Sequence, residues 1–385
     1  MILTLTPHLP HLIPKKIMNV VIIGCGVIGA AIAYELSLVK GINITVFDCQ
    51  PPAQASTGAA LGVLVGVVSQ KIQGKAWRWR ETSIQRYETL IPELEAITKQ
   101  KIPYNRQGIL SLCSEEENFA KWQSLQSIRH SQGWELEIWD NDKLKSICPQ
   151  VDNPKIIGAV YSPQDRQLNP TALTLALVAA AQHHGVTFKF GVTVLKPAPK
   201  TDDEPTKCDA VETTAGKITA DWFIVAAGLG STPLTAEFKQ MIDIRPVLGQ
   251  ALQVRLGHVL GNPNFQPAIT GNDVHIVPVG GGDYWLGATV EFPNDGNEIL
   301  PNDQLLVSVR QQAIAFCPEL AQANIVRTWS GLRPRPEGRP APIIEKLPGF
   351  NNVLLATGHY RNGVLLAPAT AYAIREMITS SSLQS

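Results

Sequence analysis

Short apolar runs alternate with amphipathic stretches along the first part of the chain. Residues 19–23 and 43–47 are apolar and rich in β-branched side chains, which is typical of buried parallel strands. Residues 30–38 between them contain good helix formers and no proline, so they predict a helix. The same alternation returns further on, with a helix at 170–184 capped by Asn169 and strands at 186–190 and 221–227. The pattern predicts an α/β fold built on a parallel sheet.

The pattern changes between residues 246 and 332. Strands separated by Gly, Asn, Asp and Pro turns are predicted there at 250–256, 274–279, 284–290 and 325–332. Such a succession indicates a separate antiparallel sheet. Further elements are predicted on either side of it: an amphipathic helix at 76–100, a strand at 108–113, a polar helix at 114–133, a buried strand at 352–356 and a final helix to 378.

Length, charge and cysteine content narrow the class of protein. A chain of 385 residues and 41.9 kDa exceeds one ordinary hydrophobic core, so two domains are expected. Its 33 basic residues balance its 33 acidic ones, which removes the electrostatic case for a nucleic-acid partner or an anionic membrane. The six cysteines form no CxxC pair, so we expect no disulfide framework and no metal site, and a reducing, cytoplasmic setting fits best.

No segment of the sequence reads as a membrane anchor or a secretory signal. No run reaches the roughly 18 apolar residues that a membrane helix needs. Residues 1–17 are interrupted by Pro7, Pro10 and Pro14, and their basic pair follows the apolar part, the reverse of a signal peptide. We interpret residues 1–17 as a loose extension and leave open whether they precede a natural start at Met18.

Three glycines, Gly24, Gly26 and Gly29, follow the first predicted strand in a GxGxxG motif. They provide a tight turn, room for a pyrophosphate beside the backbone, and close packing of helix on strand. Asp48 ends the second strand, nineteen residues after Gly29, where its carboxylate can accept hydrogen bonds from ribose hydroxyls. The alternative is a plain tight turn with a solvated acid, but the ordered succession of elements favours FAD or NAD binding.

Two other segments allow both a structural and a functional interpretation. Residues 55–62 are small and glycine-rich, which suits either close approach of the backbone to a ligand or a tightly packed loop. Residues 77–80 read Trp-Arg-Trp-Arg and form either a basic–aromatic patch or part of a packed interdomain helix. The balanced charge of the chain favours the packed helix.

Further motifs complete a recognisable set. They are the loop 56–62, Ala226-Ala227-Gly228 at a strand end, Gly331-Leu332-Arg333-Pro334, and the most specific run, ATGHYRNGVLLAP at 356–368. With the glycine motif and Asp48, they make the chain resemble the FAD-dependent D-amino-acid-oxidase-like (DAO) oxidoreductases, and within them the bacterial glycine oxidases. The resemblance covers about residues 18–378.

The resemblance implies a discontinuous Rossmann-type FAD-binding domain at 18–86, 152–235 and 335–385, and an antiparallel-sheet substrate domain at 87–151 and 236–334. It implies non-covalent FAD, because none of the cysteines matches the covalent flavin attachment of the sarcosine oxidase relatives. The residues that it assigns to the cofactor are Gly24, Gly26 and Gly29 at the pyrophosphate, Asp48 at the AMP ribose, Val194 or its neighbours near the adenine, Ser56, Thr57 and Ala60 at the flavin edge, Gly228, and Arg361, Asn362, Gly363, Val364 and Leu365 around the flavin ring.

The resemblance also assigns a substrate site. Arg333 matches the arginine that binds the substrate carboxylate, a task suited to a bidentate guanidinium, although an ion pair at a domain junction is the alternative. Arg361 stands where the family places a second arginine near the substrate. His275 replaces a tyrosine of the glycine oxidases and Val290 a methionine. His275 either donates to a carboxylate, best when protonated, or faces solvent, and both readings stay open.

The expected reaction is oxidation of the C–N bond of a small amino acid or secondary amine. A hydride would pass to flavin N5, the imine would hydrolyse to an oxo acid and ammonia or amine, and O₂ would reoxidise the flavin to give H₂O₂. One alternative is a D-amino-acid dehydrogenase with a quinone-type acceptor. A second is a flavin-binding assembly factor without turnover. The substrate, its chirality and a homo-oligomeric state stay open.

Overall fold

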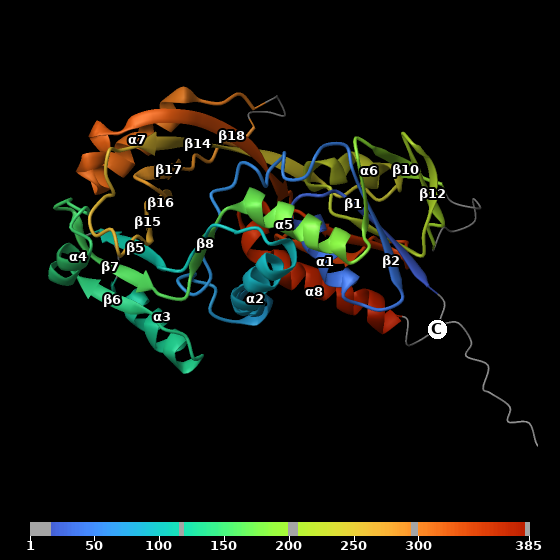
Figure 1. Ribbon diagram of the computed structural model, residues 1–385, viewed down its shortest axis with the longest axis horizontal. Coiled ribbons are helices and arrows are strands. Elements are labelled where there is room, and N and C mark those ends of the chain that lie inside the picture. Colours follow the sequence, from blue (N-terminus) through green and yellow to red (C-terminus); the bar gives the residue numbers. More distant parts are fainter. Residues whose placement is uncertain (1–16, 115–118, 199–206, 294–298, 382–385) are drawn as a thin grey trace, which may run out of the picture.

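The computed structural model describes residues 17–114, 119–198, 207–293 and 299–381. Nearly all of the predicted extension at 1–17, and residues 115–118 of the predicted helix at 114–133, lie outside these ranges. Two layers stand side by side in Figure 1: a sheet covered by several helices, and a larger sheet that carries α7 (Asp303–Phe316) on its outer side.

The first layer is a six-stranded sheet. It is parallel except for β19 at one edge. Its strand order is β19 (Ile343–Lys346), β20 (Val353–Thr357), β13 (Trp222–Val225), β1 (Met18–Ile23), β2 (Ile42–Asp48) and β9 (Thr187–Phe190). The buried apolar runs of the sequence form these strands because a strand covered on both faces has no side that can be polar.

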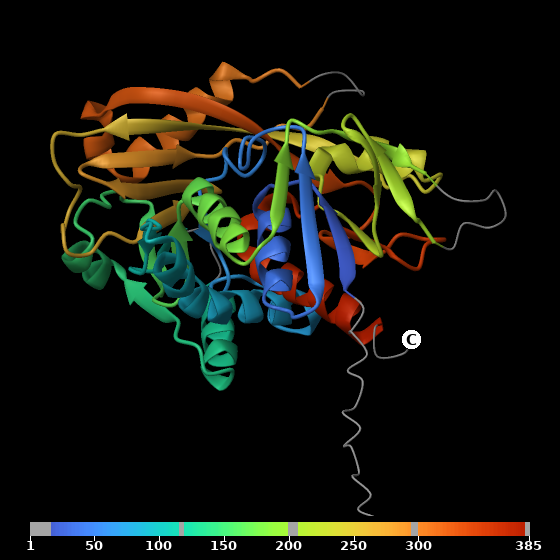
Figure 2. The same ribbon diagram turned by 45° about the vertical axis from the view of Figure 1, so that its right-hand side comes forward.

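Alternate residues of each strand serve the two faces of this sheet. Val20 and Ile22 of β1 pack against the helical face, whereas Val21 and Ile23 pack against the other. The helical face carries α1 (Val27–Ser37), α2 (Gly74–Thr98), α5 (Pro170–His183) and α8 (Gly363–Ser381) (Figure 2). The other face carries α6 (Ser231–Glu237) and a small sheet of β10 (Val194–Pro197), β11 (Ala210–Thr213) and β12 (Gly216–Thr219).

The second layer is an eight-stranded sheet in which all neighbours are antiparallel except β15 and β5. Its order is β18 (Asn324–Pro336), β14 (Ile244–Arg255), β17 (Asp283–Gly287), β16 (Val274–Gly280), β15 (Ala268–Gly271), β5 (Ile109–Ser114), β7 (Ile156–Ser162) and β6 (Glu137–Asp140). The remaining named elements of 119–168 and 63–105 are α3 (Phe119–Ser131), α4 (Asn141–Ile147), and a three-stranded sheet of β3 (Val63–Leu64), β8 (Arg166–Leu168) and β4 (Tyr104–Asn105).

The predicted fold class, a parallel α/β layer with an antiparallel layer, is confirmed. The expected N-cap of α5 is also confirmed, since the Asn169 side chain accepts a hydrogen bond from the Ala172 N–H. The sequence pattern missed α7, which interrupts the strand-rich segment, and the hairpin of β11 and β12. The two-domain division stays a prediction, but α2 runs through its boundary at 86/87 and β7, placed after its boundary at 151/152, pairs with β5.

The Trp-Arg-Trp-Arg segment belongs to a packed helix, as predicted. Trp77 and Arg80 of α2 are buried, and the Arg129 guanidinium of α3 stacks on the Trp77 ring at 3.6 Å. Trp77 therefore packs α2 against α3, and neither Trp77 nor Arg80 belongs to an exposed patch. Among the described helices, none combines the length and apolar content that crossing a membrane requires.

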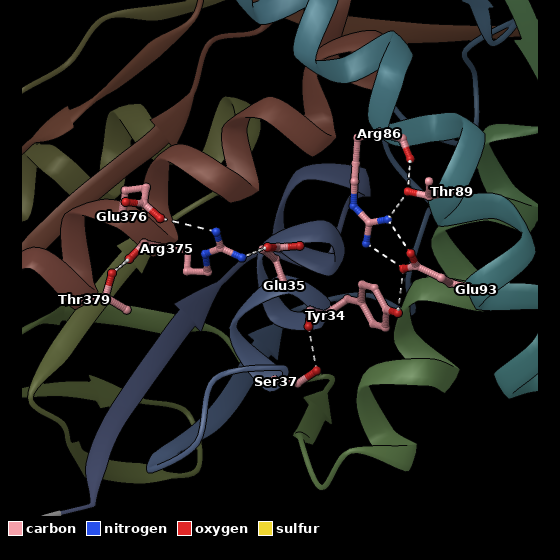
Figure 3. A network of polar contacts seen from close by, with 9 residues as sticks. All are labelled: Tyr34, Glu35, Ser37, Arg86, Thr89, Glu93, Arg375, Glu376 and Thr379. Atoms are coloured by element: carbon pink, nitrogen blue, oxygen red, sulfur yellow. Dashed lines mark hydrogen bonds and ion pairs between the residues drawn. The ribbon is translucent and has the colours of Figure 1, made fainter.

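Polar contacts join the helices of the first layer (Figure 3). Glu35 of α1 is buried and accepts a hydrogen bond from Arg375 of α8, while Arg86 and Glu93 form an ion pair within α2. Tyr34, beside Glu35, reaches Glu93 with its hydroxyl. These contacts tie α1 to α8 and to α2 on the helical face of the six-stranded sheet.

Glu35→Gln is expected to lower the free energy of unfolding by about 1–2 kcal/mol, because Arg375 then lacks its buried anionic partner. Urea unfolding would measure it. The matched control is Glu376→Gln, which removes a 59% exposed partner of the same Arg375 and should change stability by less than about 0.5 kcal/mol. Equal effects of the two substitutions would contradict the role given to burial.

Candidate active site

The carboxyl ends of the parallel strands meet at one edge of the first sheet. β1 ends at the glycine turn, β2 ends at Asp48, β13 leads into Gly228, and β20 leads into the turn Tyr360–Asn362. In open α/β sheets this edge is where ligands bind. The structure therefore brings the ends of four predicted strands together at one edge.

The glycine turn leaves no room for side chains. Gly24 has a φ of 105°, in the left-handed region, and a Cβ added to it would lie 2.5 Å from the Ala226 carbonyl oxygen. A Cβ on Gly29 would lie 1.9 Å from the carbonyl oxygen of Gly24. Close contact between β1, β13 and α1 thus requires glycine at these positions.

Asp48 and Thr57 hold the turn from two sides. One carboxylate oxygen of Asp48 accepts a hydrogen bond from the Cys25 N–H at 2.6 Å, and the other accepts from Gln50 N–H at 2.9 Å. The Thr57 hydroxyl accepts from the Val27 N–H at 3.1 Å, at the start of α1. The predicted residue Thr57 therefore lies directly at the glycine motif, where the N–H groups of the first turn of α1 present partial positive charge.

The small-residue loop also contacts the second layer. The Ser56 hydroxyl donates to the Leu332 carbonyl at 2.6 Å, and the Trp329 indole N–H donates to the Ala59 carbonyl at 3.0 Å. A Cβ on Gly331 would lie 2.3 Å from that of Ala59. The loop predicted to line the flavin is thus fixed to β18 just before Arg333, and Ala60 beside it is half-buried.

Gly228 and Val194 occupy the flanks of this edge. Gly228 has a φ of 56°, and its carbonyl accepts a hydrogen bond from the Thr357 hydroxyl at 3.2 Å, which ties the ends of β13 and β20 together. Val194 begins β10, next to Val192, whose N–H donates to the Asp48 carbonyl at 3.1 Å. Val194 therefore lies close to the end of β2 and Asp48, and its place near the adenine stays a prediction.

Arg333 lies near the carboxyl end of β18 with its guanidinium half-buried. One Nη1–H donates to the Leu248 carbonyl at 3.0 Å. Among the described residues, no carboxylate forms an ion pair with it. Burial, and then the charge of Arg361, lower the pKa of Arg333 below its ordinary value. An arginine remains protonated in proteins, so Arg333 brings a positive charge to the site without an ion-pair partner of its own among the described residues.

His275 of β16 is close enough to both arginines for their charges to act on it. Burial, then Arg361, lower the pKa of His275 to about 4. Its Nδ1 atom is buried and has no hydrogen-bond partner. The imidazole is therefore neutral near pH 7, which argues against a protonated His275 that donates to a carboxylate. Its buried Nδ1 has no hydrogen-bond partner, which argues against a surface histidine whose hydrogen bonds are all made.

The flavin-loop residues form the turn before α8. Tyr360 has a φ of 52°, Arg361 is exposed and its guanidinium lies 3.2 Å from the Asp273 carboxylate, and the Asn362 side chain is 3.5 Å from an Arg80 nitrogen. Gly363 begins α8, followed by the buried Val364 and Leu365. The predicted run is thus held by Asp273, just before β16, on one side and by Arg80 of α2 on the other.

His359, just before this turn, gives a prediction about pH. The side chain is 3% exposed, Nε2 lies 2.9 Å from the Thr370 hydroxyl, and burial lowers the pKa of His359 to about 3. In the unfolded chain this histidine binds a proton below about pH 6.5, whereas in the folded chain it stays neutral down to about pH 3. The free energy of unfolding should therefore fall as the pH drops from about 6.5 towards 3, by up to about 1.4 kcal/mol per pH unit.

The check is the free energy of unfolding at several pH values in the wild type and in His359→Gln, which should show a smaller slope. Thr370→Val keeps the imidazole and removes only its partner, so this control should retain the slope. An unchanged slope in His359→Gln would contradict the assignment.

Sequence reasoning missed Gly249 and Leu248, which contact the Arg333 guanidinium. A glycine inside a strand is a known signal for close approach of another group, and Gly249 lies in such a strand, so this signal was present. It also missed Trp329 as the partner of the small-residue loop. Nothing in the local pattern indicates that contact.

The residues of this edge fit a dinucleotide. The glycine turn is a cradle without room for a Cβ at Gly24 or Gly29, the positive end of α1 begins at it, and Asp48 offers carboxylate oxygens. The unpartnered Nδ1 of His275 and the unpaired Arg333 lie at the far end, beside the second layer. The arrangement suits a long cofactor along the edge and a small anion at its end.

Comparisons with known proteins find relatives of this chain among oxidases of amino acids. The chain spans about half the length of curated bifunctional relatives: it is 31% identical over 364 residues to the bifunctional protein ThiO/ThiG of Nostoc sp., with 94% of this chain and 52% of that protein covered. It is 29% identical to glycine oxidase of Bacillus licheniformis, with 94% of each covered. The crystal structure of glycine oxidase from Bacillus cereus superposes with a TM-score of 0.82 at 26% identity, covering 94% of this chain and 95% of that one.

The model of the DAO family, described as FAD dependent oxidoreductase, matches residues 19–377. This range contains both layers and every residue of the site described above. With the fold and the cradle at the strand ends, the match shows that the chain belongs to the DAO family of FAD-dependent oxidoreductases.

Proposed function

We propose that this chain oxidises the C–N bond of a small amino acid or secondary amine as a glycine oxidase-like enzyme with non-covalent FAD, in the cytoplasm. The observation that carries the proposal is the half-buried Arg333 guanidinium, which has no ion-pair partner among the described residues. A guanidinium binds a planar carboxylate through two parallel N–H donors. The relatives named glycine oxidase support an amino-acid substrate.

In this proposal the cofactor would lie along the strand ends. The glycine turn would hold its pyrophosphate, Asp48 its ribose, and Val194 or its neighbours would lie near its adenine. Ser56, Thr57 and Ala60 would line the flavin edge, Gly228 would also contact the cofactor, and Arg361, Asn362, Gly363, Val364 and Leu365 would surround the flavin ring. When bound, FAD supplies a two-electron acceptor for the hydride on the substrate Cα.

The side chains bind and orient the substrate. Arg333 fixes the carboxylate and thereby the position of Cα, which is a proximity effect. Neutral His275 offers Nδ1 as a hydrogen-bond partner for the substrate. Arg361, paired with Asp273, lies close enough for its charge to act on Arg333 and His275. In this proposal the imine product would hydrolyse in water to an oxo acid and ammonia or amine, and O₂ would be the final electron acceptor, reduced to H₂O₂.

A visible spectrum of the purified protein followed by anaerobic addition of glycine, sarcosine, and D- and L-amino acids tests the proposal. We expect oxidised-flavin bands that acid denaturation releases into solution, bleaching by at least one amine, and return of colour with peroxide on admission of air. A protein that binds FAD but is bleached by no amine would overturn the proposed reaction. Bleaching without reoxidation by air would replace O₂ with another acceptor, as in a dehydrogenase.

A further inference from the structure

Gly249 of β14 lies directly against the Arg333 guanidinium. β14 and β18 are paired so that Val247 is opposite Arg333 and Gly249 is opposite Gly331. A Cβ added to Gly249 would lie 2.2 Å from Arg333 Nη2 and 2.4 Å from both Cζ and Nη1. The guanidinium therefore fills the space that a side chain at position 249 would occupy.

The backbone itself does not require glycine here. Gly249 is absent from the glycines with positive φ, so any residue can adopt its conformation. It lies inside the continuous strand β14. The close approach of the guanidinium is what demands a residue without a side chain.

β14 is held firmly at this point. The Gln250 N–H donates to the Thr289 hydroxyl at 2.8 Å, and the Gln250 side-chain amide donates to the buried Glu291 carboxylate at 2.9 Å. Leu248 and Glu291 exchange two backbone hydrogen bonds, at 2.9 and 3.0 Å. A methyl group at position 249 would therefore move the flexible tip of Arg333 and not the strand beneath it.

The Arg333 guanidinium is oriented by its contact with β14 at Gly249 and by one hydrogen bond. Nη1 donates to the Leu248 carbonyl at 3.0 Å, which fixes the rotation of the group over β14. Arg361 repels it from the side of the turn Tyr360–Asn362. The other N–H donors of the fork remain for an anion.

We propose that Gly249 is a positioning residue of the substrate site: its missing side chain seats the Arg333 guanidinium against β14, in the orientation that binds a carboxylate. This inference rests on the proposed function of Arg333. It adds a residue that touches neither substrate nor cofactor and acts through the arginine alone.

Gly249→Ala in the FAD-loaded protein tests the inference. We expect the KM for the amino acid and the Kd of acetate, a carboxylate without an amine, to rise together by roughly 10- to 100-fold, because the fork is displaced by about 1 Å. Acetate binding is measured by calorimetry. kcat should stay within about threefold, because Cα is still presented once substrate is bound, and the flavin content should be unchanged.

The matched control is Gly257→Ala, beyond the end of the same strand, where an added Cβ meets nothing within 4 Å. It should leave KM and the acetate Kd unchanged. A loss in this control equal to that in Gly249→Ala would overturn the positioning role.

A double variant separates this inference from the function on which it rests. Gly249→Ala should add nothing to the loss in Arg333→Ala, because no guanidinium is left to displace. A full additional loss would overturn the inference.

If Arg333→Ala weakens acetate binding and Gly249→Ala does not, the positioning role is wrong and the role of Arg333 stands. If Arg333→Ala leaves acetate binding intact, the proposed role of Arg333 is wrong. Should Gly249→Ala alone lower the unfolding midpoint, the double variant should restore it.

Discussion

Arg333→Ala is expected to lower kcat/KM for the amino-acid substrate by about 100-fold or more. Removal of one partner of a desolvated charge pair costs about 2–5 kcal/mol, which is the size of this change. The half-buried guanidinium forms no ion pair with a carboxylate of the described residues, so its N–H donors are available to a ligand. Arg333→Lys keeps the charge without the planar fork and should lose about tenfold. Steady-state kinetics over the substrate panel would measure both.

The matched control lies two residues along the same strand. Arg335 forms an ion pair with Glu337 at 2.8 Å, and its side chain is 38% exposed. Arg335→Ala should change kcat/KM by less than about twofold, because an exposed ion pair contributes little. A similar loss from both substitutions would show that β18, and not the Arg333 guanidinium, is what the enzyme needs.

Gly29→Ala is expected to weaken FAD binding by at least about tenfold. The added Cβ would lie 1.9 Å from the carbonyl oxygen of Gly24, so the glycine turn must open and its N–H groups must move. Overpacking of this kind costs about 1–3 kcal/mol, and each 1.4 kcal/mol is about tenfold in affinity. Flavin fluorescence on titration of the apoprotein would measure the Kd.

Loss of the fold would give the same result, so circular dichroism of the apoprotein must accompany the titration. We expect the apoprotein of Gly29→Ala to retain its helical signal while the flavin Kd rises. Gly257→Ala, with free space around the added methyl group, should bind FAD like the wild type. Unchanged FAD affinity in Gly29→Ala would contradict the assignment of the turn to the pyrophosphate.

The predicted nucleotide half of the site is local in the sequence, and the structure places its residues together. Strand, glycine turn, helix and Asp48 lie within about thirty residues, and their spacing alone brings Asp48 to the turn, where it bonds the Cys25 N–H. The substrate half is different. Residue types and family resemblance pointed to Arg333 and His275, but not to their surroundings.

The surroundings of His275 show what local reasoning lacks. The two readings of this residue, a protonated donor or a solvated surface group, depend on which charges and nonpolar groups surround it. Those come from the turn Tyr360–Asn362 and from β18, far along the chain, and together with burial they lower its pKa to about 4. Local reasoning also missed the helix α7, because its helical pattern is short and lies among strand signals.

The sequence by itself therefore determined the fold class and the local order of strand, glycine turn and helix, because hydrophobic period and motif spacing act over a few residues. The roles that the family resemblance implies for the glycine turn and for Arg333 stay predictions. The tertiary structure decided where that arginine points. Pairing of β14 with β18 brings Gly249 beneath Arg333, and contact of Ser56 with Leu332 joins the small-residue loop to the same strand across 276 positions. Register between distant strands depends on the packing of whole faces, which no local pattern contains.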